Sequence, residues 1–248
     1  MSGLPQVLLV EDDPSIRRFV SMALEGLPVR LSTAANLAEA RSLLGEGPFS
    51  LVILDLMLPD GSGLDLLQQM FEQHPEWRGK AELAVFSAGF DEATRTRLKH
   101  WGVHRILAKP ISLADLERHV LECIQPAQVM GDAASTSSTA ILQAARQQAI
   151  DTFFGGDAPL FDAFAQACRL QFAQDVEMAD AAVEANDLAT LRRVVHSLKT
   201  VLLTLGHPDL SALAARAEAA AADLVPEAVS LWHQLRADLL PLVDPSGR

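Results

Sequence analysis

Charged and hydroxyl side chains follow directly after four short apolar runs in the N-terminal half of the sequence. The runs are "QVLLV", "LVIL", "LAVF" and "RILA", and the residues after them are Glu11, Asp12 and Asp13, then Asp55, Ser87 and Lys109. Carboxylates gathered at one place do not all stay ionised without a counter-charge. Mg²⁺ takes oxygen ligands and often bridges carboxylates to phosphate. If these side chains meet, their types therefore favour a phosphoryl-transfer site with Asp55 as nucleophile.

The same runs belong to an alternation of apolar and amphipathic segments within residues 1–125. The predicted strands are "QVLLV", "VRLST", "LVILD", "LAVFS" and "RILA", and the helical patterns begin at Pro14, Asn36, Ser62, Asp91 and Ser112. This alternation predicts a parallel sheet with helices on both faces. In an open parallel sheet, the ligand crevice lies at the carboxyl ends of the strands. We therefore expect the acids, Ser87 and Lys109 to converge on one edge of the sheet.

Each of these motifs also has an ordinary structural interpretation. Asp13 before Pro14 has the chemistry of a helix N-cap, and "PDGSG" is typical of a loop with glycines at positive φ. Ser87 alone would be a loop hydroxyl, and Lys109 alone a solvated cation. Their placement at successive strand ends favours the functional interpretation over coincidence.

Four motifs together resemble a response-regulator receiver domain, the phosphoaccepting module of two-component signalling, over residues 5–125. They are "VLLVEDDPSIRRFV", "LVILDLMLPDGSGLDLL", "AVFSAG" and "GVHRILAKPIS". The resemblance implies a flavodoxin-like α/β fold, a doubly wound five-stranded parallel sheet of order 2-1-3-4-5. It also implies that Asp55 accepts the phosphoryl group and that the domain has self-phosphorylation and autodephosphorylation chemistry.

The resemblance implies a Mg²⁺ site beside Asp55. Glu11 and Asp12 match the family's acidic pair for this metal. Asp55 and the backbone carbonyl of Met57 would be further ligands. Asp13 occupies the flanking position and is expected to be a cap more than a ligand.

Three further positions of the receiver motifs concern phosphate binding and signalling. Ser87 matches the family's switch hydroxyl, and Lys109 matches the phosphate-binding lysine, before a proline that is usually cis in this family. Ile106 departs from the family, which has an aromatic residue three positions before the lysine. An aliphatic side chain is expected to signal phosphorylation weakly or differently across the face of the fourth helix, fifth strand and fifth helix.

The sequence changes character after residue 125. Residues 126–140, "PAQVMGDAASTSSTA", lack apolar periodicity and predict a linker. Residues 141–248 contain Ala- and Leu-rich patterns interrupted by "GGDAP", "AND", "GHPD" and "LVP". These patterns predict about five helices, the last four long enough for an antiparallel four-helix bundle.

His196 has a lysine one helical turn away in this second half. The apolar residues around it recur at helical spacing and predict a buried stripe, formed by Leu191, Val194, Val195, Leu198, Leu202 and Leu205. His196 lies beside the stripe, with Lys199 at i+3 on the same face. A lone helical histidine is usually a surface or structural residue. An imidazole can nevertheless attack phosphorus, and a nearby lysine can hold phosphoryl oxygens.

The stretch "HSLKT...LGHPDLSALA" resembles a histidine-containing phosphotransfer (HPt) domain, and the resemblance extends over residues 141–243. The family signature is a His-x-Leu-Lys helix, a glycine and a second Ala/Leu-rich helix. The resemblance implies that His196 is a second phosphoryl site assisted by Lys199. Thr200 departs from the family, which commonly has Gly or Ser there, and its branched side chain is expected to crowd a partner.

Composition narrows the classes of function. The chain has 248 residues and a net charge of −12, with −5 in residues 1–125 and −7 in the remainder. Such acidity disfavours a nucleic-acid partner. Cys123 and Cys168 lie in helical patterns, so we expect packed thiols in a reducing compartment. The sequence shows neither a signal peptide nor a membrane span, which predicts a cytoplasmic protein without a membrane partner.

The leading hypothesis is a two-component phosphorelay protein. A sensor histidine kinase or another phosphohistidine donor would phosphorylate Asp55 with Mg²⁺, and His196 would exchange phosphoryl with another receiver domain. The chain lacks a Gly-rich ATP-binding motif and is not expected to be a kinase. Two alternatives stay open, a binding module in which the phosphorylated receiver controls access to the HPt bundle without internal transfer, and an adaptor with a vestigial acidic pocket.

Overall fold

The computed structural model describes residues 4–89, 91–124 and 141–243. Within them the chain divides into two compact units. The linker predicted at 126–140 lies outside the described residues.

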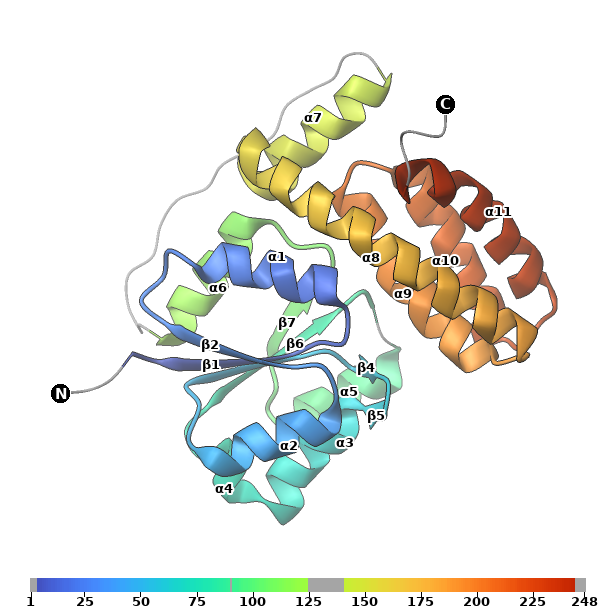
Figure 1. The fold of residues 1–248 in the computed structure, drawn as a ribbon. Helices are drawn as coiled ribbons and strands as arrows, with labels where there is room; N and C mark the ends of the chain where they lie inside the picture. The colour runs from blue at the N-terminus through green and yellow to red at the C-terminus, as the bar shows by residue number, and fades with distance from the viewer. Residues whose placement is uncertain (1–3, 90, 125–140, 244–248) are drawn as a thin grey trace. The chain divides into compact units, whose positions relative to one another are not determined.

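The N-terminal unit is a five-stranded parallel sheet between two layers of helices (Figure 1). Its strands are β1 (Gln6–Val10), β2 (Arg30–Ala34), β3 (Leu51–Leu54), β6 (Glu82–Ser87) and β7 (Arg105–Ala108), in the order β2-β1-β3-β6-β7. Every neighbouring pair in this sheet is parallel. The predicted flavodoxin-like fold and its strand order, 2-1-3-4-5 in chain order, are confirmed.

Helices cover both faces of this sheet. On one face lie α1 (Pro14–Leu24) and α6 (Leu113–Ile124), and on the other lie α2 (Leu37–Glu46), α3 (Gly63–Gln68), α4 (Pro75–Arg78) and α5 (Glu92–His100) (Figure 1). The central strands β1 and β3 are buried, whereas the edge strands β2 and β7 keep exposed positions. Near-continuous apolar runs such as "LVIL" are expected for strands covered on both faces.

The segment after β3 is less regular than the sequence predicts. It first forms a short antiparallel hairpin of β4 (Met57–Leu58) and β5 (Gly61–Ser62). The helix predicted to begin at Ser62 does so, with Ser62 as its N-cap, but α3 passes after six residues into a π-helical turn, η1 (Gln69–Gln73). A further short helix, α4, then starts at Pro75.

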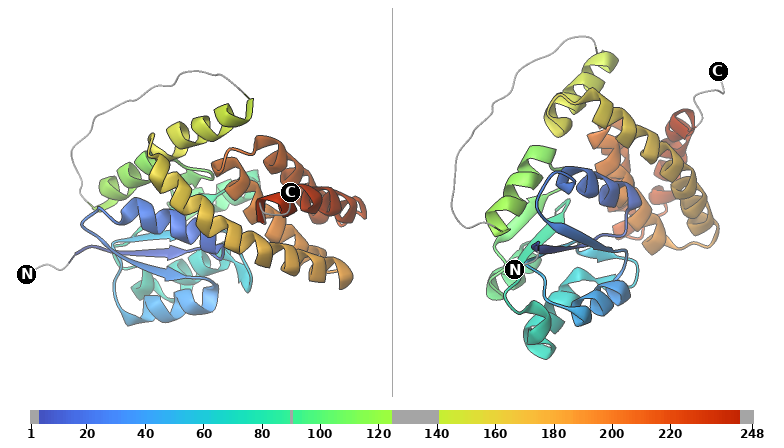
Figure 2. Two further views of the ribbon diagram at one scale, coloured as in Figure 1. Left: turned by 45° about the horizontal axis from the view of Figure 1, so that its top comes forward. Right: turned by 60° about the vertical axis from the view of Figure 1, so that its left-hand side comes forward.

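Within residues 141–243, the C-terminal unit is all-helical, as predicted. It contains α7 (Ile141–Phe154), α8 (Ala158–Glu184), α9 (Leu188–Thr204), α10 (Pro208–Ala222) and α11 (Glu227–Val243). The last four contact one another in a closed ring, α8 to α9 to α10 to α11 and back to α8, and Figure 2 shows them as a bundle. Asp157 and Asp187 cap α8 and α9 with their side chains. The apolar stripe predicted on α9 is buried. His196, Thr200 and Thr204 are buried as well. The buried face of α9 is therefore wider than the stripe of apolar residues.

None of the helices in the described part of the chain is both long and apolar enough to span a bilayer.

Candidate functional site

The carboxyl ends of β1 and β3 place three carboxylates together. Glu11 and Asp12 follow β1, and Asp55 follows β3, which pairs with β1 in parallel. The Asp55 amide donates a hydrogen bond to the Val10 carbonyl at 2.9 Å and fixes the two strand ends side by side. Carboxylate oxygens of Glu11, Asp12 and Asp55 lie within 4.8 Å of one another. The convergence predicted from the sequence is therefore present for these acids.

Lys109 joins this cluster from the end of β7. Its ammonium Nζ donates to Glu11 Oε2 at 2.5 Å and to Asp55 Oδ2 at 2.6 Å. The lysine side chain is fully buried, and Nζ also lies 4.8 Å from the centre of the Phe86 ring. The peptide bond between Lys109 and Pro110 is cis. Side chains that are 98 and 54 residues apart in sequence are thus bonded directly.

Burial and neighbouring charges shift the pKa values of this cluster. Burial raises the pKa of Glu11 well above its usual value, the charge of Asp55 adds to this, and Lys109 only partly opposes it. Burial alone would lower the pKa of Lys109, but the charges of Asp55 and Glu11 outweigh it and raise that pKa. One ammonium therefore does not balance the buried carboxylates. A divalent cation with oxygen ligands fits this donor set.

The remaining predicted residues lie around the cluster. Asp13 caps α1, because its Oδ1 accepts from the amides of Ser15 at 2.7 Å and Ile16 at 3.1 Å. This agrees with its expected role as a cap. The Met57 amide donates to Asp55 Oδ1 at 3.1 Å, so the backbone of Met57 lies beside the proposed nucleophile.

Ser87 ends β6 and pairs with Ala108, the residue before Lys109. The Lys109 amide donates to the Ser87 carbonyl at 2.9 Å. The Ser87 hydroxyl itself donates to the Gly89 carbonyl at 3.0 Å and accepts from the Gly89 amide at 3.3 Å. Ser87 is therefore at the predicted edge, with its hydroxyl engaged in its own loop. Ile106, which stands where the receiver family has an aromatic residue, is exposed on β7.

Gly63 is required where α3 starts against the end of β3. A Cβ atom there would lie 2.2 Å from the Asp55 carbonyl oxygen and 3.0 Å from Leu56 Cα, both backbone atoms. In the same loop, Gly61 adopts φ 149°, a conformation that favours glycine. The "PDGSG" segment thus uses one glycine for its backbone conformation and another for space beside Asp55.

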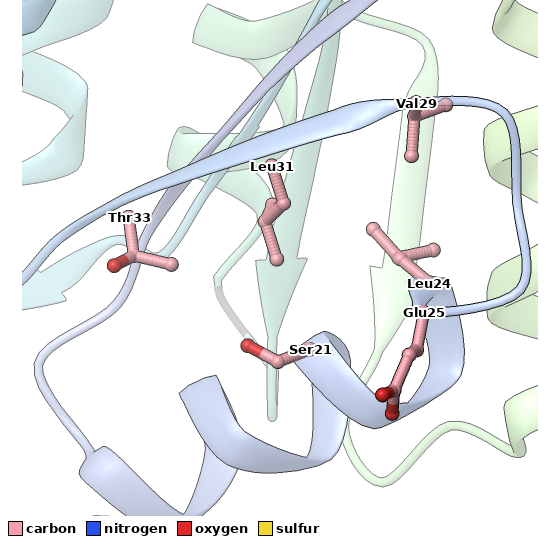
Figure 3. Close-up of a pocket in the computed structure, with 6 residues that line it drawn as sticks. All are labelled: Ser21, Leu24, Glu25, Val29, Leu31 and Thr33. Atoms are coloured by element: carbon pink, nitrogen blue, oxygen red, sulfur yellow. The ribbon is translucent and has the colours of Figure 1, made fainter.

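A hollow of about 400 Å³ lies away from these residues, between α1 and the edge strand β2 (Figure 3). Ser21, Leu24 and Glu25 line it from the helix side, and Val29, Leu31 and Thr33 line it from the strand and the turn before it. The side chains that the sequence marks for chemistry do not line this hollow.

The second predicted site is on α9 and gains a residue that the sequence interpretation missed. His196 Nδ1 lies 2.6 Å from Glu218 Oε1, and Lys199 Nζ donates to Glu218 Oε2 at 2.5 Å. Glu218 belongs to α10, so its carboxylate bridges the two predicted residues from the neighbouring helix. The available signal was a glutamate within the alanine run "AEAAAA", next to a helix that carries the histidine.

Several small side chains of α10 are buried near Glu218 in the sequence. Ala214, Ala217 and Ala221 are buried, and such small side chains let two helices approach closely. The Ser211 hydroxyl donates to the Lys199 carbonyl at 2.7 Å and adds a polar link between the helices. Polar contacts from Ser211 and Glu218 thus join α10 to α9.

The Glu218 carboxylate fixes the orientation of the imidazole. Burial alone would raise the pKa of Glu218, but the hydrogen bond and charge of His196, together with Lys199, lower it to about 2. An ionised carboxylate only accepts hydrogen bonds, so Nδ1 is the protonated nitrogen. His196 Nε2 has no hydrogen-bond partner among the described residues. In the neutral imidazole, Nε2 is therefore the nitrogen that carries the lone pair.

Comparisons with known proteins agree with both halves. Residues 7–121 match the family model of the response regulator receiver domain, and residues 163–241 match that of the Hpt domain. The response regulator protein PilR of Pseudomonas aeruginosa is 33% identical over 120 residues, which are 48% of this chain and 26% of PilR. The response regulator receiver protein CpdR of Brucella abortus is 30% identical over 125 residues, 47% of this chain and 94% of CpdR.

Other relatives match the same half. The transcriptional regulatory protein KdpE of Escherichia coli is 32% identical over 114 residues, 46% of this chain and 48% of KdpE. The chain thus spans half or less of the length of PilR and KdpE. Among solved structures, chemotaxis protein CheY4 of Vibrio cholerae has 22% identity and a TM-score of 0.45, over 49% of this chain and 99% of CheY4. The chain belongs to the two-component signalling family, with a response-regulator receiver domain followed by an Hpt domain.

Proposed function

We propose that this chain is a phosphorelay protein with one phosphoryl site in each unit. Asp55 accepts a phosphoryl group from a sensor histidine kinase or another phosphohistidine donor, and His196 exchanges a phosphoryl group with another receiver domain. The observation that carries the proposal is the presence in one chain of Asp55 bonded to Lys109 and of His196 oriented by Glu218 beside Lys199. The proposed partners imply action in the cytoplasm.

The receiver site supplies a nucleophile and positive charge. A carboxylate oxygen of Asp55 attacks phosphorus as the bond from phosphorus to the donor's imidazole nitrogen breaks, and the departing imidazole takes up a proton. Lys109, which now bonds to Asp55, would hold a phosphoryl oxygen, and the Ser87 hydroxyl is the proposed second donor. Mg²⁺, held by Glu11, Asp12, Asp55 and the Met57 carbonyl, would neutralise the developing negative charge.

The Hpt site supplies an oriented imidazole. With Nδ1 donating to Glu218, Nε2 attacks the phosphorus of an aspartyl phosphate, and the carboxylate of that aspartate leaves. Lys199 would bind the phosphoryl oxygens after releasing part of its contact with Glu218. The reverse step has the same parts, with the aspartate carboxylate as nucleophile and the imidazole as leaving group.

The two sites can be tested in the full chain with phosphorylated sensor kinase and Mg²⁺. Wild type, Asp55→Ala and His196→Gln are followed for acid-stable phosphate on aspartate and base-stable phosphate on histidine, with His233→Gln as the control for an exposed bundle histidine. We expect Asp55→Ala to abolish aspartyl phosphate and His196→Gln to abolish histidyl phosphate.

The pattern of labelling also distinguishes the route. Label that reaches His196 only when Asp55 is intact indicates a route through Asp55, whereas label on His196 in Asp55→Ala indicates two separate branches. Absence of label at both residues in the wild type contradicts the proposal.

A further inference from the structure

We propose that Asp60 is a positioning residue for the Mg²⁺ site, because it fastens the hairpin that carries Met57 to the N-terminus of α2. The inference rests on the proposed function of the Asp55 site. It concerns the β4–β5 hairpin, whose two-residue tip contains Asp60 between Leu58 and Gly61.

The Asp60 carboxylate makes two hydrogen bonds to a distant segment. Its Oδ1 accepts from the Leu37 amide at 2.8 Å, and its Oδ2 accepts from the Ala38 amide at 3.0 Å. These residues are the first two of α2 and lie 23 and 22 positions earlier in the sequence. The first amides of a helix have no partner within the helix and carry positive partial charge. They suit a carboxylate.

Helix α2 has its own cap in addition to Asp60. Asn36 Oδ1 accepts from the Glu39 amide at 2.8 Å, and Glu39 Oε2 accepts from the Ala35 amide at 2.8 Å. The helix start is therefore capped locally, as its sequence provides. The contact with Asp60 therefore stabilises the hairpin as well as the helix.

The hairpin needs such an anchor. Each of its strands has two residues, and a ribbon of this size is not stable by itself in water. Gly61, next to Asp60, packs tightly on the same helix, because a Cβ atom there would lie 2.8 Å from Leu37 Cδ1. The hairpin is thus held to α2 at two adjacent positions.

Met57 connects this anchor to the proposed metal site. It lies three residues before Asp60, pairs with Ser62 across the hairpin, and donates its amide hydrogen to Asp55 Oδ1 at 3.1 Å. A hairpin released from α2 would let Met57 move, together with the carbonyl proposed to bind Mg²⁺. Outer groups that orient metal ligands commonly change metal affinity by about 10-fold to 100-fold when removed.

Mg²⁺ binding to the full chain tests this inference. Calorimetric titration is carried out on wild type, Asp60→Ala, Asp60→Asn and Asn36→Ala. Asn36→Ala is the matched control, because it removes a cap from the same helix without releasing the hairpin. We expect Mg²⁺ affinity to fall about tenfold in Asp60→Ala, less in Asp60→Asn, which keeps one acceptor oxygen, and by less than about twofold in Asn36→Ala.

A second measurement separates positioning from damage to Asp55. The rate of Asp55 phosphorylation by acetyl phosphate is measured against Mg²⁺ concentration, and we expect Asp60→Ala to need more Mg²⁺ while reaching a near wild-type rate at saturation. Equal losses of affinity in Asp60→Ala and Asn36→Ala, or no loss in either, overturn the inference while the proposed function stands. If Asp60→Ala does not fold, Asp60→Asn decides in the same way. A wild type that binds no Mg²⁺ overturns the metal site itself and the inference with it.

Discussion

Lys109 and Glu218 hold comparable positions in their sites, with opposite charge. Lys109 bonds to Glu11 and Asp55, and Glu218 bonds to His196 and Lys199. Each bridging residue orients the group proposed to react with phosphorus. Lys109 offsets the charge of Asp55, and Glu218 pairs with the charge of Lys199. Removal of one member of such a buried set leaves the others without a partner. We therefore expect the loss of Lys109 or of Glu218 alone to impair the site to which it belongs.

Glu218 is predicted to set the tautomer of His196. In Glu218→Ala, the imidazole of His196 loses the acceptor for its Nδ1–H. The tautomer protonated on Nε2 therefore becomes more populated. That tautomer has no lone pair on Nε2 with which to attack phosphorus. We expect phosphoryl transfer to His196 to slow by about tenfold to a hundredfold. Nitrogen chemical shifts of the imidazole report the tautomer directly. Glu177→Gln, at an exposed position of α8, is the control, and an unchanged tautomer in Glu218→Ala contradicts the role.

The same carboxylate is predicted to make the bundle sensitive to acid. Burial alone would raise the pKa of Glu218, but its interactions with His196 and Lys199 outweigh burial and lower that pKa from its ordinary value of 4.5 to about 2. The unfolded chain therefore binds more protons between these values. The stabilisation is complete above about pH 4.5 and is lost as pH falls toward 2.

Urea unfolding of the bundle between pH 2 and 5 measures this effect. Trp232 is buried in the bundle and reports its unfolding when Trp77 and Trp101 are replaced by Phe. We expect the free energy of unfolding to fall less steeply with acid in Glu218→Gln than in the parent. Parallel curves for the two proteins would show that Glu218 does not contribute.

At the scale of elements, the start of α3 is predicted to be sensitive to one methyl group. Gly63→Ala places Cβ against the Asp55 carbonyl, which is backbone and cannot turn aside. We expect a lower free energy of unfolding and slower phosphorylation of Asp55. Gly45→Ala in α2 is the matched control, because its Cβ meets no atom within 4 Å and alanine favours the helix by about 0.5–1 kcal/mol.

Chemical denaturation and acetyl phosphate labelling of both variants test this. A Gly63→Ala protein as stable and as reactive as Gly45→Ala would refute the close approach of α3 to Asp55. The hairpin before α3 also depends on a contact with a distant element, because Asp60 bonds its tip to the start of α2.

For the whole molecule, the two compact units are predicted to have separate cores. Leu54 is buried in β3, and truncation of a buried leucine to alanine costs about 2–5 kcal/mol. Leu54→Ala should therefore destabilise the receiver unit, measured in urea by the fluorescence of Trp77 and Trp101 in a Trp232→Phe background. The Trp232 transition of the bundle should keep its midpoint. A joint shift of both transitions would show that the units unfold together.

The sequence by itself determined the fold class, the strand order through its family resemblance, and the place of Asp55, Lys109 and His196. Those features follow from periodicity, from strand-end positions and from motifs, which are all local along the chain. The hairpin, the π-helical turn η1, the hydrogen bonds of Ser87 within its own loop, and the bridging roles of Asp60 and Glu218 were decided by the tertiary structure. A carboxylate that bonds across 22 or 23 positions leaves no mark in local spacing, because its partner is fixed only when separate elements pack side by side.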